Sequence, residues 1–310
     1  MTGDDHALAR DLAEQAGRRL IELRAHGGDP DVLRKAGDRL SHEFLTAELA
    51  ARRPGDIVLS EEGADNPARL DARRVWIVDP LDGTREFGDP GRTDWAVHVA
   101  LWERSDATGP GDLLAPSLPG GPIPPGPPWG GTPPPSPPGG LTAGAVALPA
   151  QGRILSTLDP PSPHRCDIEA VITAPMSHRL GSAGGAAGGE PGPASGRIRI
   201  VVSRTRAPQF VRNISDLTDA ELVPLGSAGA KVAAVVGGEV DAYVHGGGFY
   251  EWDTAAPVAV ARAAGFHASR IDGSALVYNQ ADLLMPDILV CRPALAATLL
   301  QAIREVTHAS

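Results

Sequence analysis

The residues with the clearest chemical potential form the string WIVDPLDGT at positions 76–84. An apolar run, typical of a buried strand, ends there in two carboxylates and a glycine turn. Asp79 and Asp82 can face one cation pair, and the Leu81 carbonyl can add a third hard oxygen, the type of ligand that Mg²⁺ prefers. The string therefore predicts a divalent metal site.

The turn that ends this string can also bind an anion. Free amides around Gly83 and Thr84 can hold a phosphate oxygen, because successive backbone N–H groups in a turn form an anion-binding concavity. An Asp-Gly pair by itself is more often a hairpin turn. The phosphate interpretation therefore depends on further acidic residues that would complete a site.

Two further acidic strings meet that condition. LSEEG at 59–63 follows a short apolar run and supplies Glu61, and EWDTAAP at 251–257 opens a helix and supplies Asp253. Taken alone, Asp253 is explained as a helix N-cap, and Glu61 as a solvated loop edge. Three such strings in this order favour a metal site over those separate structural explanations.

These strings resemble the metal-dependent sugar-phosphatase superfamily, which contains inositol monophosphatases, fructose bisphosphatases and 3'(2'),5'-bisphosphate nucleotidases. The nucleotidase branch, often called CysQ, is the most similar, through DPLDGTREF at 79–87, Ser-Glu-Glu and Trp-Asp-Thr-Ala-Ala-Pro. The resemblance extends from the first helix to Cys291, apart from one insertion. It implies an α/β fold of five stacked layers, αβαβα, with the catalytic pocket between two halves.

The same resemblance implies a cofactor of two or three Mg²⁺ ions. Glu61, Asp79 and the Leu81 carbonyl would hold one ion, and Asp79, Asp82 and Asp253 a second. A third ion, held more weakly, would lie near Glu61. Paired ions lower the pKa of water and stabilise the departing alkoxide during an in-line displacement.

The resemblance also implies a proton relay. The family positions the attacking water with a threonine of the metal loop, Thr84 here, backed by an acidic residue on the second helix. Asp38 in the string GDRL is the match, since the nucleotidase branch places Asp-Arg-Leu near this point; a helix N-cap is its alternative role. Thr84, Asp38 and Glu61 are the expected catalytic residues. The family's lysine-bearing loop is not recognisable in residues 27–37, where a mobile loop is expected.

Substrate selection is expected from the C-terminal half. GSAGAK at 226–231 combines a turn, a helix N-terminus and a cation, which suits a phosphate. In nucleotidase relatives the matching Gly-Ser-x-x-x-Lys segment contacts the nucleotide, and Ser203-Arg204 resembles another such turn. Lys231 as an ordinary solvated helix residue is the alternative, because the segment fails the P-loop pattern. The expected substrate contacts are Gly83, Thr84, Ser203, Arg204, Ser227 and Lys231.

The activity implied is Mg²⁺-dependent hydrolysis of the 3'-phosphate of 3'-phosphoadenosine 5'-phosphate to AMP and phosphate, which would relieve product build-up in sulfate assimilation. One alternative keeps the chemistry and changes the substrate to inositol monophosphate or fructose 1,6-bisphosphate, alone or as mixed specificity. A second is a nucleotide sensor that binds without turnover. In a third, the chain is an enzyme whose proline-rich insertion binds a partner protein.

Composition limits the partners. With a net charge of −10, the chain lacks the clustered cations that bind a nucleic acid polymer, and an acidic protein needs metal to bind an anionic phosphorylated small molecule. No apolar run approaches the roughly 20 residues of a membrane span, and the polar amino terminus does not match a secretion signal. The cytoplasm is the expected location, and Cys166 and Cys291 are expected to be buried free thiols. Relatives often dimerise, so a homodimer is one expected assembly.

At 310 residues the chain is expected to form two intimately packed domains. An N-terminal α+β metal-binding domain would span 1–195, with a Pro/Gly-rich insertion at 105–140, and a C-terminal α/β substrate-binding domain 196–310. Apolar periodicity predicts helices at 5–25, from Asp38 to about 53, 228–236, 253–264 and from 293. Strands are expected at 57–59, 75–78, 95–102, 145–148, 154–155, 198–202, 240–244 and 288–291.

Overall fold

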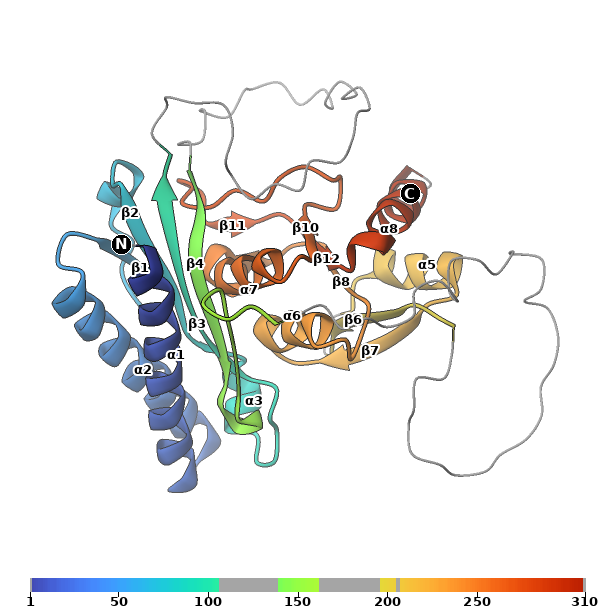
Figure 1. Cartoon of the computed structure of the whole chain (residues 1–310). Coiled ribbons are helices and arrows are strands. Elements are labelled where there is room, and N and C mark those ends of the chain that lie inside the picture. The colour runs from blue at the N-terminus through green and yellow to red at the C-terminus, as the bar shows by residue number, and fades with distance from the viewer. Residues whose placement is uncertain (1, 106–138, 162–195, 205–206, 309–310) are drawn as a thin grey trace.

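The structure, a computed structural model, describes residues 2–105, 139–161, 196–204 and 207–308. The predictions for Cys166 and for most of the insertion at 105–140 lie outside these residues. The described chain alternates helices and strands, and its two larger sheets share the fold's central helices (Figure 1).

The first sheet is built from five strands in chain order: β1 (Ile57–Ser60), β2 (Arg74–Asp82), β3 (Ala96–Arg104), β4 (Gly139–Leu148) and β5 (Arg153–Ser156). β1 and β2 are parallel, and the remaining neighbours are antiparallel. The insertion therefore connects two adjacent strands of one sheet, β3 and β4.

The second sheet has the order β10-β12-β8-β6-β7. Its strands are β6 (Arg199–Ser203), β7 (Glu221–Leu225), β8 (Ala242–His245), β10 (His267–Ser269) and β12 (Ile288–Cys291). β9 (Phe249–Tyr250) and β11 (Leu284–Met285) form a separate, short antiparallel pair. The two larger sheets come from either side of the predicted boundary at residues 195 and 196, which itself stays a prediction.

Helices complete five layers, αβαβα (Figure 1). α1 (Thr2–Ala25) and α2 (Pro30–Arg52) cover the outer face of the first sheet. α6 (Ala228–Val236) and α7 (Glu251–Ala263) lie between the two sheets. α5 (Gln209–Thr218) and α8 (Pro293–His308) cover the far face of the second sheet. This arrangement confirms the predicted fold class.

Strand β2 shows why the first sheet needs helices on both faces. Trp76 and Val78 pack with α1 and α2, whereas Val75 and Ile77 pack with α6 and α7. All four side chains are fully buried. Successive side chains of a strand point to opposite faces, so an unbroken apolar run requires cover on each side.

The second helix differs from the prediction. α2 begins at Pro30, after an Asp29 N-cap whose carboxylate accepts hydrogen bonds from the amides of Asp31 and Val32. Proline is well suited to the first helical position, because its fixed φ is helical and the missing N–H has no partner there. The predicted loop is therefore helical from residue 30 to residue 37, and Asp38 lies mid-helix rather than at an N-cap.

Three shorter elements complete the described fold. The single turn of α3 (Thr84–Gly88) follows β2, and 3₁₀ turns lie at Pro67–Leu70 and Pro149–Gln151. None of the described helices combines the length and apolar character that crossing a membrane requires.

Candidate functional site

Three carboxylates converge where β2 ends against the first turn of α7. One oxygen from each of Asp79, Asp82 and Asp253 lies within 4.8 Å of the others. Two of these residues come from the N-terminal half and one from the C-terminal half, 171 positions after Asp82 in the sequence. The structure thus brings together the acidic residues of two strings that are far apart in the chain.

An irregularity in β2 explains how Asp79 and Asp82 reach the same point. Residues three apart in a regular strand face opposite sides of the sheet. The β2–β3 register shifts between the pairs Asp79–His98 and Asp82–Ala96, and this bulge turns the second carboxylate toward the first. The Asp-Pro-Leu-Asp spacing is therefore compatible with a common site only because the strand is distorted there.

Helix α6 holds the carboxylate of Asp82. Its two oxygens accept hydrogen bonds from the first amides of the helix, from Ala228 at 3.2 Å and Gly229 at 2.6 Å. Burial raises the pKa of Asp82, but His98, the Gly229 amide and Lys231 together bring it below the ordinary value. Asp82 is therefore the member of the cluster that the protein itself keeps ionised.

Asp253 lies at the third position of α7 and has a structural role as well. Its Oδ2 accepts a hydrogen bond of 2.6 Å from the amide of Tyr250, the N-cap residue. Burial and the charge of Asp82 raise its pKa to about 6. The N-cap role considered for Asp253 is therefore wrong, because Tyr250 is the N-cap; the Asp253 carboxylate completes the cap from the third helical position and also belongs to the cluster.

The pKa values of Glu61 and Asp79 are both raised, by burial and by neighbouring negative charges. Burial, together with the charges of Asp82, Glu61 and Asp253, raises the pKa of Asp79 well above its usual range. Burial and the charge of Asp253 raise the pKa of Glu61 to about 7, although a hydrogen bond with Asp79 opposes this. Like charges in a buried site raise one another's pKa, because each disfavours the other's ionised form.

The geometry fits a divalent cation. Asp79 is 1% exposed, and its Oδ2 has no hydrogen-bond partner among the described residues. A buried carboxylate oxygen without a partner is costly, and a cation between the carboxylates would supply the missing partner and offset their repulsion. The donors are all oxygens, which suits hard cations such as Mg²⁺, Ca²⁺ or Mn²⁺.

The predicted relay residues lie next to each other beside this cluster. Thr84 Oγ1 is 3.3 Å from Asp38 Oδ1 and 3.1 Å from the Leu81 carbonyl, and its hydroxyl can donate to either. Burial and the charge of Glu62 raise the pKa of Asp38 to about 6, against the hydrogen bond from Thr84. The Leu81 carbonyl, predicted to bind metal, therefore also belongs to this group of polar contacts.

Gly83 connects β2 to α3, and its backbone conformation requires glycine. Its φ of +85° lies in the left-handed region, which favours glycine. A Cβ built there would lie 3.0 Å from the Cβ of Ser227 and 3.3 Å from the Asp94 carbonyl. The turn of the N-terminal half thus packs directly on the first residues of α6.

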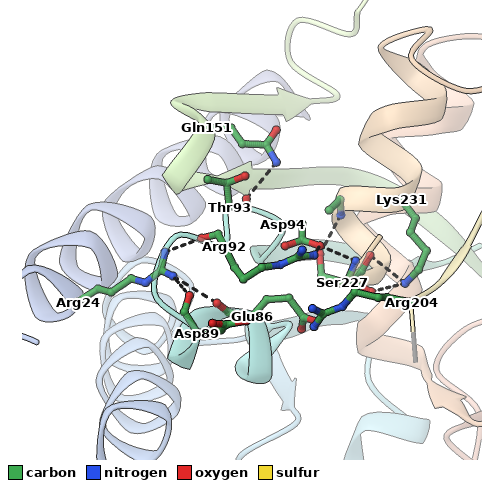
Figure 2. Close-up of polar contacts among 12 residues, drawn as sticks. Arg24, Glu86, Asp89, Arg92, Thr93, Asp94, Gln151, Arg204, Ser227 and Lys231 are labelled. Atoms are coloured by element: carbon green, nitrogen blue, oxygen red, sulfur yellow. Dashed lines mark hydrogen bonds and ion pairs between the residues drawn. The ribbon is translucent and has the colours of Figure 1, made fainter. Parts of the chain in front are cut away.

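Figure 2 shows that Ser227, Lys231 and Arg204 have protein partners in this region. Ser227 is 3% exposed and caps α6 by accepting from the Ala230 amide at 2.9 Å. The ammonium of Lys231, in a side chain that is 4% exposed, donates to the carbonyls of Gly226 and Ser227. The alternative of a solvated Lys231 is therefore wrong.

The second predicted turn is placed differently. Ser203 ends β6, where it pairs with Leu225 of β7. The Arg204 guanidinium forms an ion pair of 2.7 Å with Glu86 of α3, a contact between the two halves of the chain. Arg204 thus contacts α3, the helix that follows Asp79 and Asp82 in the chain. Ser203, the preceding residue, pairs with β7.

Two residues at this site escaped the sequence analysis. Asp94 accepts hydrogen bonds from the amide of Gly226 on its side chain, at 2.7 Å, and from the amide of Ser227 on its carbonyl, at 3.2 Å (Figure 2). His98 lies beside Asp79 and Asp82. The only signal for His98 was a histidine within an otherwise apolar strand, and for Asp94 a carboxylate just before that strand.

Comparison with known proteins identifies clear similarities. A model of the inositol monophosphatase family matches residues 7–109 and 189–308. A 3'-phosphoadenosine 5'-phosphate phosphatase of Mycobacterium leprae is 46% identical over 304 residues, covering 97% of this chain and 94% of the relative. A protein of the same description from Mycobacterium tuberculosis is 44% identical over 292 residues, covering 94% and 90%.

A solved structure shares the fold. CysQ from Bacteroides thetaiotaomicron, described as a bacterial member of the inositol monophosphatase family, superposes with a TM-score of 0.63 at 24% identity. The match covers 93% of this chain and 97% of that protein. At this identity the likeness supports the five-layer architecture and carries no information on the substrate.

Proposed function

This chain belongs to the inositol monophosphatase family, and from that premise we propose that it is a phosphatase acting on 3'-phosphoadenosine 5'-phosphate. It removes the 3'-phosphate and releases AMP and inorganic phosphate. The curated relatives that match nearly the whole chain carry this description. They favour this substrate over inositol monophosphate and fructose 1,6-bisphosphate, and an enzyme over a nucleotide sensor.

The observation that carries the proposal is the convergence of Asp79, Asp82 and Asp253 from both halves of the chain. Three carboxylates at such separations repel one another and repel a phosphate. A phosphatase can use them only through cations, and the oxygen donors suit Mg²⁺. We therefore assign two or three Mg²⁺ ions to Glu61, Asp79, the Leu81 carbonyl, Asp82 and Asp253.

When bound, Mg²⁺ lowers the pKa of water and stabilises negative charge on the phosphoryl group and the leaving oxygen. The residues of the chain supply position and proton transfer. Thr84 Oγ1 orients the attacking water and accepts its proton as its own proton passes to Asp38 Oδ1, 3.3 Å away. A pKa of about 6 lets Asp38 act as a base near neutral pH.

The predicted substrate contacts divide into three groups in this proposal. Gly83 and Thr84 present backbone amides beside the cluster, where the 3'-phosphate is held. Ser227 and Lys231 are buried, so they shape the pocket wall and add positive charge behind it. Arg204, more exposed and already paired with Glu86, lies with Ser203 at the edge, where the nucleotide's remaining groups would be recognised.

A direct comparison of substrates tests the proposal. We would measure kcat/KM with Mg²⁺ for 3'-phosphoadenosine 5'-phosphate, inositol 1-phosphate and fructose 1,6-bisphosphate, using the same enzyme preparation. The proposal predicts the highest value for the nucleotide, by at least about tenfold, which corresponds to about 1.4 kcal/mol of transition-state binding. A smaller preference, or a preference for either sugar phosphate, would reject the substrate assignment.

Two further expectations belong to this proposal. A cytoplasmic location agrees with a chain that has two widely separated cysteines, of which Cys291 is buried. Assembly as a homodimer would be measured by light scattering of the purified chain. Neither expectation alters the chemistry assigned to the site.

A further inference from the structure

His98 is a buried polar residue for which the proposed reaction so far has no use. It lies in β3 directly opposite Asp79 of β2, so both side chains face the layer of α6 and α7. Its side chain is 0% exposed. A histidine in the middle of an apolar strand must find polar partners, because burying an unsatisfied ring nitrogen costs about 1–3 kcal/mol.

One ring nitrogen connects the strand to the helix that carries Asp253. Nδ1 of His98 lies 3.1 Å from the carbonyl oxygen of Trp252, in the first turn of α7. A carbonyl only accepts hydrogen bonds, so Nδ1 carries a proton and donates. Because Trp252 directly precedes Asp253, this bond fixes the backbone beside one member of the cluster.

The other ring nitrogen faces the remaining members. Nε2 lies 3.2 Å from Oδ2 of Asp82, but it has no well-aligned hydrogen bond among the described residues. The same oxygen of Asp82 accepts the Gly229 amide at 2.6 Å. A Cβ added to Gly229 would overlap Nε2, so glycine there allows the ring to lie against α6.

His98 therefore touches each structural element that brings a carboxylate to the cluster or holds one there. We propose that His98, with a proton on each ring nitrogen, is a positioning residue: Nδ1 donates to the Trp252 carbonyl and Nε2 forms an ion pair with Asp82, so that the two halves of the chain present their metal ligands at a fixed separation. The inference rests on the proposed function of the cluster. Groups that hydrogen-bond to metal-ligating carboxylates orient them and raise metal affinity.

Side-chain surrogates can separate the two nitrogens. In His98→Gln the amide reaches the position of Nε2 and faces Asp82, whereas in His98→Asn the shorter amide reaches only the position of Nδ1 and faces Trp252. His98→Ala removes both contacts. Val99→Ala is the matched control, because Val99 is equally buried in the same strand but packs on the opposite face, among the residues of α1 and α2.

The measurement is the dissociation constant of Mg²⁺ alone, by isothermal titration calorimetry, with the melting temperature in EDTA as a separate readout of stability. The proposal predicts that His98→Ala and His98→Asn weaken Mg²⁺ binding by about tenfold or more, the range found for such outer contacts. His98→Gln should recover part of this affinity. Val99→Ala should lower the melting temperature and leave Mg²⁺ affinity unchanged.

A purely structural role gives a different result. If the His98 variants that fold bind Mg²⁺ within about twofold of the wild type, far less than the range for outer contacts, the inference is overturned, whatever their melting temperatures. His98→Gln and His98→Asn keep the test decisive if His98→Ala does not fold. Wild-type protein that binds Mg²⁺ but releases no phosphate from the nucleotide would defeat the proposed function and leave this comparison intact.

Discussion

Thr84 Oγ1 lies 3.3 Å from Asp38 Oδ1, although the two residues are 46 positions apart in the chain. Thr84 is the first residue of the short helix α3, directly after β2, and Asp38 lies in the middle of α2. Gly37 makes this approach possible, since a Cβ there would lie 2.7 Å from the Phe87 ring of the same short helix. The close packing of α2 on α3 thus places a carboxylate next to the hydroxyl that orients water.

The first prediction concerns this pair. Asp38→Asn should lower kcat by about 10²-fold or more, because the variant cannot accept the proton that Thr84 releases. KM and the melting temperature should change little, since Asn fills the same space. Glu43→Gln, which changes an exposed acid on the same helix, serves as the control. Equal turnover by the two variants would remove Asp38 from the mechanism.

The second prediction concerns repulsion within the cluster. Asp79→Asn should raise the melting temperature in EDTA above neutral pH, because it removes the free-energy cost of protonating, or of burying as a charge, a carboxyl beside Asp82 and Glu61. The same change should abolish most of the melting-temperature increase that Mg²⁺ gives the wild type, since a ligand stabilises the folded state only at concentrations near or above its dissociation constant. Differential scanning fluorimetry with and without Mg²⁺ measures both effects. A variant less stable than the wild type in EDTA would contradict this account of the cluster.

The third prediction is a pH dependence of the metal-free protein. In the folded state the pKa is about 7 for Glu61, about 6 for Asp253 and higher than usual for Asp79. Their protonated forms favour folding, so this stability is complete below the unfolded pKa values, near 4, and is lost as pH rises through 6 and 7.

The melting temperature in EDTA should therefore fall between pH 5.5 and 8, and Mg²⁺ should reduce that fall. Scanning calorimetry at matched ionic strength would measure it, with Asp79→Asn as the comparison that should show a weaker dependence. A melting temperature that rises with pH in EDTA would have the wrong sign for this assignment.

The fourth prediction concerns the contact between the two halves. In Gly226→Ala the new Cβ would lie 2.5 Å from Cγ of Glu86 and 2.7 Å from Oδ2 of Asp94. Overpacking of this kind costs about 1–3 kcal/mol of folding free energy. The variant should also weaken Mg²⁺ binding, because the displaced turn carries the α6 amides that hold Asp82. Gly55→Ala, where a Cβ meets nothing within 4 Å, is the control for unfolding measurements in urea.

Much of this fold and site could be predicted from sequence because the signals were local. Continuous apolar runs predicted the strands covered on both faces, and β12 and α6 have the predicted bounds. The family resemblance rests on three short strings, and two of them supply the carboxylates of the cluster. Residues such as Asp79 and Asp253 could be found because chemistry demands their type at a fixed place in each string.

One error concerns a local signal, and the others arose where tertiary structure decides. The Asp29-Pro30 signal was overlooked as a helix start, and Asp38 was then placed at the N-terminus of a helix that actually begins eight residues earlier. Lys231 resembles an open anion-binding cation in sequence, yet it is buried because Asp94 and Gly83 of the other half pack on the turn before it. His98 gave no periodic signal, since its role depends on Trp252 and Asp82, which are distant in sequence.

The central claim is that carboxylates from the two halves bind Mg²⁺ and so allow hydrolysis of a nucleotide 3'-phosphate. The most direct test measures phosphate release from 3'-phosphoadenosine 5'-phosphate by the purified chain, with Mg²⁺ and then with excess EDTA. The account predicts one phosphate per AMP formed with Mg²⁺, and no release in EDTA until Mg²⁺ is restored. Folded protein that releases no phosphate with Mg²⁺ present, or releases it equally in EDTA, would contradict the account.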